Sequence, residues 1–171
     1  MTTTPTPWTR FLRWYGETFG SEKYIIKQQW GDEEYLTRYT LRGKRFGGKP
    51  NLFLHRFHRS DYDAPHNHPW PFTSLILAGG YWEKTPRIKW QHGRCYPAMK
   101  RLWYGPGRIL VRPASWRHSV EIPEDGREVW TLVQTGSKIG SWGFFCGPLW
   151  DTYKNWQQHF IRMKETGHGC D

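Results

Sequence analysis

The sequence lacks several features that would place it in a specialised class of protein. No stretch stays apolar over the length that a membrane-spanning helix needs, so we expect no membrane crossing. Only three cysteines occur, Cys95, Cys146 and Cys170, and none forms a C-x-x-C pair, which argues against a disulfide framework or a zinc ribbon. Residues 1–7 lack the charged and apolar segments of a secretory signal. We therefore expect a cytoplasmic protein.

Acidic residues are also few. Fifteen Asp and Glu stand against 25 Lys and Arg, so the formal net charge is +10, and the aromatic residues include 12 Trp. Basic and aromatic residues together are compatible with binding of nucleic acid or a nucleotide. They are equally typical of a solvated basic surface over an aromatic core, or of a field that attracts a small anionic substrate. The basic residues are scattered along the chain rather than gathered in one tail.

The chain has the length of one compact domain, residues 1–171. We expect an N-terminal extension with a short helix in residues 1–20, a β-barrel in 21–149, and a C-terminal helix and tail in 150–171. Short segments rich in β-branched and aromatic residues alternate with Gly and Pro turns, which predicts an all-β sandwich or barrel. The expected strands are residues 24–30, 34–41, 51–58, 72–77, 81–84, 88–91, 100–104, 108–112, 118–122, 128–134 and 141–145.

Three histidines form the strongest local pattern. His66 and His68 are two residues apart, so in an extended segment their side chains project to the same face. Two neutral imidazoles at that spacing can bind one cation. His118 follows a turn-forming stretch that contains Gly107 and Pro113, and it supplies a candidate third ligand at the start of a strand.

These residues resemble the two motifs of the cupin superfamily, G-x5-H-x-H-x3,4-E-x6-G and G-x5-P-x-G-x2-H-x3-N. His66, His68 and Gly79 match the first motif, and Pro113 and His118 match the second. The resemblance covers about residues 51–150 and is to a group of small uncharacterised bacterial and phage cupins. It implies a jelly-roll barrel (a double-stranded β-helix), a homodimer, and a divalent metal held by the three histidines. The two helices expected from the sequence pattern would pack outside this barrel.

The departures from these motifs bear on the metal. Phe72 and Thr73 stand where the first motif has its glutamate, Ser115 replaces a glycine, and Ile122 replaces the final asparagine. The implied ligand set is then three histidines alone, which is similar to that of the thiol dioxygenases and implies Fe(II). Zinc, nickel or manganese remains compatible with the same ligands.

Two further residues are candidates for catalysis. Glu83 follows the Gly79-Gly80 turn and is a candidate fourth ligand or general base, and Arg112 is a candidate for binding a substrate anion. Arg56 and Arg117 are weaker candidates for the same task. His55 is expected to be a hydrogen-bonded barrel residue. Asp61 and Asp63 fit a turn, with orientation of a ligand imidazole as the alternative.

The leading hypothesis is a metal-dependent oxygenase, a dioxygenase that uses Fe(II) and acts on a small polar or anionic substrate. The first alternative is a metal-dependent isomerase or lyase, in which the cation acts as a Lewis acid. A non-catalytic cupin that binds nucleic acid or a nucleotide is the second, and a metal-free protein similar to sugar epimerases is the third.

Overall fold

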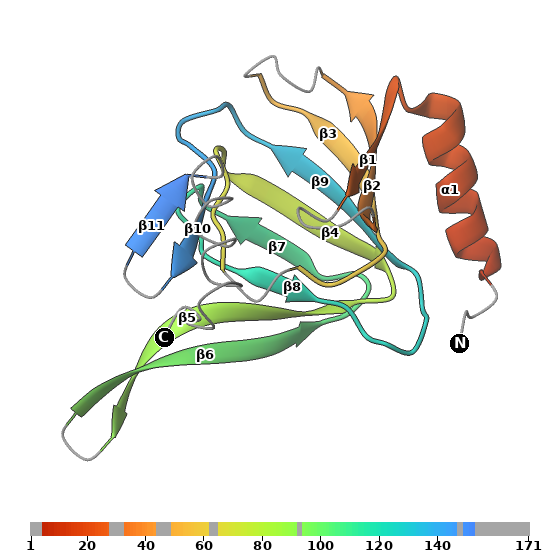
Figure 1. Ribbon diagram of the computed structural model, residues 1–171. Coiled ribbons are helices and arrows are strands. Elements are labelled where there is room, and N and C mark those ends of the chain that lie inside the picture. Colours follow the sequence, from red (N-terminus) through yellow and green to blue (C-terminus); the bar gives the residue numbers. More distant parts are fainter. Residues whose placement is uncertain are drawn as a thin grey trace.

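A computed structural model of the protein describes residues 5–27, 33–43, 49–61, 65–91, 94–146 and 149–152. One helix, α1 (Pro7–Phe19), is followed by a series of short and long strands (Figure 1). No helix within those ranges has the length and hydropathy to span a membrane. The strands are β1 (Glu22–Lys27), β2 (Glu34–Arg42), β3 (Leu52–Phe57), β4 (Phe72–Ala78), β5 (Tyr81–Gln91), β6 (Arg94–Tyr104), β7 (Ile109–Arg112), β8 (Ser119–Glu121), β9 (Val129–Thr135), β10 (Gly143–Cys146) and β11 (Leu149–Thr152).

The strands form two antiparallel layers. The large sheet has the order β1-β2-β3-β9-β4-β7, and smaller sheets have the orders β6-β5-β8 and β10-β11. His66 joins the smaller sheets, because isolated bridges pair it with His118 on one side and with Phe144 on the other. Two opposed antiparallel layers whose sequence neighbours cross between sheets are the arrangement of a jelly roll. The predicted all-β fold class is confirmed.

Helix α1 covers the outer face of the large sheet (Figure 1). Pro7 occupies its first turn and the hydroxyl of Thr6 accepts the N–H of Thr9, so the helix begins where a proline and an N-cap favour it. The helix lies within residues 1–20, where a short helix was predicted. Its side chains pack into a cluster made of Leu12, Tyr39, Leu54, Ala78 and Trp130.

A second cluster fills the space between the two layers. Alternation along each strand sends every other side chain inward, so the barrel interior takes its apolar residues from both sheets. Its members are Ile76, Tyr81, Leu110, Val120 and Val129.

The structure differs from the predicted elements in β5, in β6, which begins at Arg94 rather than at residue 100, and in the C-terminal segment. Residues 81–84 and 88–91 were expected to be separate strands, but β5 continues through Pro86, which pairs with Met99. Proline is tolerated there because β8 pairs only with residues 82–84, and the later part of β5 has an open edge. The C-terminal helix does not begin at residue 150, since residues 149–152 form β11; the remainder, 153–171, lies outside the described residues.

Candidate metal centre

The structure brings His66, His68 and His118 together. The backbone N–H of His66 donates to the carbonyl of His118 at 2.8 Å, and the reverse bond is 3.0 Å, so the two strands hold their side chains side by side. One ring nitrogen from each residue lies within 4.8 Å of the other two. We call these three residues the histidine cluster.

The spacing and charge of this cluster fit a bound metal ion. The Nε2 atoms of His68 and His118 are 2.9 Å apart. Two nitrogens that each lie about 2.1 Å from one ion would be about 3.0 to 3.4 Å apart, close to this distance. Burial lowers the pKa of His66 to about 4 and lowers the pKa of His68 well below its ordinary value. Both imidazoles are therefore neutral at physiological pH, which is the form that coordinates a metal.

Glu83 contacts the imidazole of His118 through the ring nitrogen that faces away from the cluster. Its Oε1 accepts a hydrogen bond from Nδ1 of His118 at 2.8 Å, which leaves the Nε2 lone pair directed at the cluster. Arg112 donates to both carboxylate oxygens, at 3.2 and 2.6 Å, and the indole of Trp116 donates at 3.2 Å. Burial alone would raise the pKa of Glu83, but the bonds from His118 and Arg112 lower it, so the carboxylate stays ionised.

This arrangement bears on the roles predicted for Glu83 and Arg112. Both oxygens of Glu83 are occupied by donors, and the charge of Arg112 is compensated by Glu83. A carboxylate that accepts the second N–H of a ligating imidazole fixes the tautomer and orientation of that ring. The geometry therefore fits a positioning role for this pair, one layer behind the cluster, better than contact with a substrate.

Asp61 plays a similar part beside His66. Its side chain is buried, and Oδ2 lies 3.9 Å from Nδ1 of His66 and accepts the N–H of Val120 at 2.7 Å. The hydroxyl of Tyr35 donates to Oδ1. Residues 62–64 of the turn predicted here lie outside the described residues, and the position of the Asp61 carboxylate fits the alternative, orientation of a ligand imidazole. Asp63 lies outside the described residues.

The inner face of the large sheet presents polar groups toward the cluster. Register pairs Arg38 with His55, and His55 with Thr131, so the three share one face. Nε of Arg38 donates to Nε2 of His55 at 2.9 Å, which agrees with the prediction of a hydrogen-bonded barrel histidine. After burial and the neighbouring histidines, the charge of Arg38 also lowers the pKa of His68.

Sequence reasoning missed Arg38. The signal was present, because alternation along residues 34–41 puts Arg38 on the face of Leu36 and Thr40. The two weaker candidates for binding a substrate anion have other contacts. Arg56 pairs with Glu128 at 2.7 Å, and Arg117 packs over the ring of Phe145 at 4.0 Å.

Comparisons with known proteins show the fold. No family model and no curated protein matches the sequence. Solved structures that match include the DMSP lyase DddQ from Ruegeria pomeroyi DSS-3, with 19% identity over 80% of this chain and 66% of that chain and a TM-score of 0.52. The Fe(II) form of HppE matches with 12% identity over 67% of this chain and 56% of that chain, with a TM-score of 0.47.

The polyketide cyclase RemF from Streptomyces resistomycificus matches with 15% identity, 80% and 87% coverage and a TM-score of 0.47. This chain spans 56% of the HppE chain and 66% of the DddQ chain, that is, less than two thirds of each. At such identities the likeness to DddQ shows a common fold, a double-stranded β-helix, and leaves the reaction to be argued from the site.

Proposed function

We propose that this cupin-fold protein is a metal-dependent enzyme, a mononuclear Fe(II) oxygenase of the dioxygenase type that acts on a small anionic substrate. The observation that carries the proposal is a set of three converging imidazoles, buried or half-buried, with no carboxylate in the ligand cluster among the described residues. Three neutral ligands leave coordination positions open, which suits iron that binds both a substrate and dioxygen. A ferrous ion bound there would supply the redox chemistry.

The residues around the cluster would keep its geometry fixed. Glu83 orients His118, and Asp61 lies beside the corresponding nitrogen of His66. Arg112 and Trp116 in turn hold the Glu83 carboxylate. Such outer partners raise the basicity of the ligands and restrict ring rotation, so the metal affinity depends on them.

The opposite wall supports the choice of an anionic substrate. Arg38 supplies a permanent positive charge on the inner face of the large sheet, and its planar guanidinium suits a carboxylate or phosphonate. The hydroxyls of Thr40 and Thr131 are buried on that same face, and neither has a hydrogen-bond partner among the described residues. Buried hydroxyls of this kind find partners in a ligand or in water.

The test is oxygen consumption by protein loaded anaerobically with Fe(II), with a panel of small thiols, carboxylates and phosphonates. We expect uptake with at least one anionic compound, and loss of that uptake in Arg38→Gln at a metal content equal to wild type. The control variant is Arg56→Gln, which removes the same charge from the α1 side of the sheet and should leave the uptake unchanged.

Two results would count against the proposal. Uptake no greater than that of the metal-free protein across the panel would exclude oxygenase activity on these substrate classes. Conversion of a panel compound without oxygen, at equal rates with zinc and with iron, would replace the oxygenase with a lyase or isomerase at the same centre.

A further inference from the structure

One large feature of the molecule takes no part in the metal site. Strands β5 and β6 pair with each other along their whole length, from Tyr81 opposite Tyr104 to Gln91 opposite Arg94. Strand β8 joins this sheet only at residues 82–84. The remainder, which we call the ribbon (residues 85–100), projects from the body as a two-stranded hairpin (Figure 1).

The ribbon is exposed on both faces where its side chains are described. On β5, the consecutive residues 86–89 are all exposed. On β6, residues 99–103, which include the base of the ribbon, are also exposed. Ile88 is 72% exposed and Met99 is 46% exposed. A two-stranded hairpin with neither face packed is marginally stable in water. Such a segment is expected to have a partner that covers it.

The charge of the ribbon indicates what that partner is. The segment contains Arg87, Lys89, Arg94 and Lys100, and no Asp or Glu. Among the described residues no carboxylate pairs with Arg87, Lys89 or Lys100. At the base the situation differs, since Lys84 and Arg101 share Glu121 at 2.9 and 2.5 Å. Positive charge is therefore compensated where the ribbon leaves the body, whereas the described basic side chains beyond that point have no carboxylate partner.

A second copy of the chain does not complement this surface. Each copy would carry the same basic ribbon and the same net charge of +10. Like charges placed opposite one another cost free energy, whereas a phosphate backbone neutralises them and releases its counterions.

The shape favours duplex DNA among polyanions. From residue 85 to residue 91 the ribbon extends about 20 Å at about 3.3 Å per residue, and its strands lie about 5 Å apart. The major groove of B-DNA, about 12 Å wide, admits a two-stranded ribbon, while the major groove of A-form RNA is too narrow. At the base, Trp82 packs against Trp103 with ring centroids 5.3 Å apart, and Arg101 lies 4.0 Å over Trp82. These contacts give the projecting part a firm base.

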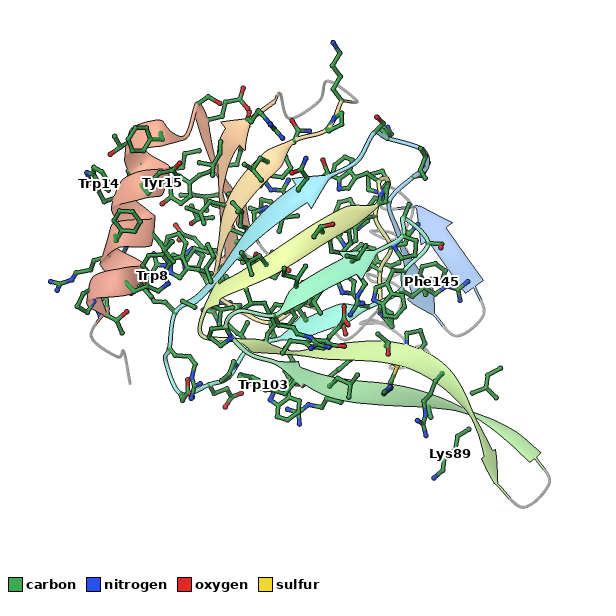
Figure 2. The ribbon with its side chains drawn as sticks, turned by 180° about the vertical axis from the view of Figure 1, so that it is seen from behind. Trp8, Trp14, Tyr15, Lys89, Trp103 and Phe145 are labelled. Atoms are coloured by element: carbon green, nitrogen blue, oxygen red, sulfur yellow. The ribbon has the colours of Figure 1, made fainter. Side chains whose placement is uncertain are left out.

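We propose that the ribbon is a DNA-binding element that enters the major groove, with the face that carries Arg87, Lys89 and Lys100 directed at phosphates. Figure 2 shows Lys89 on the projecting part and Trp103 near its base. The proposal is independent of the metal centre, because no ribbon residue contributes to the histidine cluster.

The test compares two variants of equal charge. Arg87→Gln/Lys89→Gln neutralises two ribbon residues, and Arg10→Gln/Lys138→Gln neutralises two exposed residues on α1 and on the loop after β9. Fluorescence anisotropy with a short labelled DNA duplex is recorded between about 50 and 200 mM salt. We expect the ribbon variant to bind at least ~10-fold more weakly at about 100 mM salt, with a salt slope smaller by about 2, at about 0.9 per lost phosphate contact. The control variant should bind within about 2-fold of wild type.

A second variant removes the ribbon altogether. Thr85 and Lys100 are direct partners across the strands, so an Asn-Gly turn in place of residues 86–99 can close the shortened hairpin. We expect loss of DNA binding with retained metal binding. Equal weakening in the ribbon and control pairs would overturn the proposal in favour of a general charge effect. Equal or tighter binding of an RNA duplex or a single strand would overturn the groove assignment, and a dimer that only the ribbon variants disrupt, without DNA binding, would replace DNA with a second copy.

Discussion

The barrel interior and the ribbon use polar residues in opposite ways. Around the histidine cluster, the two described carboxylates have partners close by: Glu83 meets His118 and Arg112, and Asp61 meets Tyr35 and the N–H of Val120. On the ribbon, the side chains of Arg87 and Lys89 are exposed to solvent, and neither face of the hairpin is packed where its side chains are described. Most buried polar groups are satisfied within the fold, whereas exposed basic groups remain available to a partner. The difference matches the two binding functions proposed above, a metal ion in the interior and DNA on the ribbon.

The largest expected effect is in the interior. His68→Ala removes one of three ligands, so we expect the affinity for Fe(II) or zinc to fall by more than ~100-fold, beyond the 10–100-fold typical of outer partners. Titration calorimetry of the untagged protein measures this. The matched control is His58→Ala, a histidine whose ring nitrogen faces the hydroxyl of Thr37 and lies outside the cluster. A wild-type affinity in His68→Ala would show that this ring is not a ligand.

The next effect concerns the residue behind the cluster. Glu83→Gln keeps the shape of the side chain but removes the charge that fixes the Nδ1 proton of His118, so metal affinity should fall about 10- to 100-fold. Glu121→Gln, a change on β8 at the base of the ribbon, should leave the affinity unchanged because that carboxylate pairs only with Lys84 and Arg101 among the described residues. Equal affinities in both variants would refute the positioning role.

A third comparison concerns stability. Glu128 is mostly buried and pairs with Arg13 of α1 at 2.5 Å and Arg56 at 2.7 Å. Glu128→Gln should cost about 1–2 kcal/mol of unfolding free energy, since Arg13 and Arg56 are partly exposed and screened, whereas Glu121→Gln at the ribbon base should cost less than about 0.5 kcal/mol. Urea denaturation measures both; equal costs would contradict the distinction.

The Glu128 effect should also depend on pH. Burial alone would raise the pKa of Glu128, but the hydroxyl of Thr9 and the charges of Arg56 and Arg13 lower it. A carboxyl whose pKa is lower in the folded state contributes stability above its unfolded pKa, about 4.3, and loses it as the pH falls through the folded value. The gap between wild type and Glu128→Gln should therefore be full above about pH 5 and shrink below about pH 4.

The smallest expected effect separates the two regions. The shortened ribbon should change the metal affinity by less than about 2-fold, and His68→Ala should change DNA binding by no more than that, because sites without common partners behave independently. A clear fall in metal affinity in the variant with the shortened ribbon would show that the two regions are coupled.

Much of the fold was predictable because its signals are local. Alternation and turn residues located β2, β3, β4, β7 and β9 within a residue or two, and the spacing of His66 and His68 identified a common face. The partners of these residues were less accessible. Asp61 lies beside His66, and Arg38 lies opposite His55 on a neighbouring strand. Such contacts between distant parts of the sequence depend on how the strands pair, which local patterns do not specify. Pro86 concealed the ribbon, since proline ordinarily argues against a continuous strand.

The most direct test of the central claim is metal analysis combined with X-ray absorption on untagged protein loaded anaerobically with Fe(II) and desalted. The account predicts about one iron per chain, with imidazole nitrogens as the protein ligands at about 2.1 Å, and loss of that iron in His68→Ala. Iron that washes out of the wild-type protein, or a coordination shell without imidazole, would contradict it.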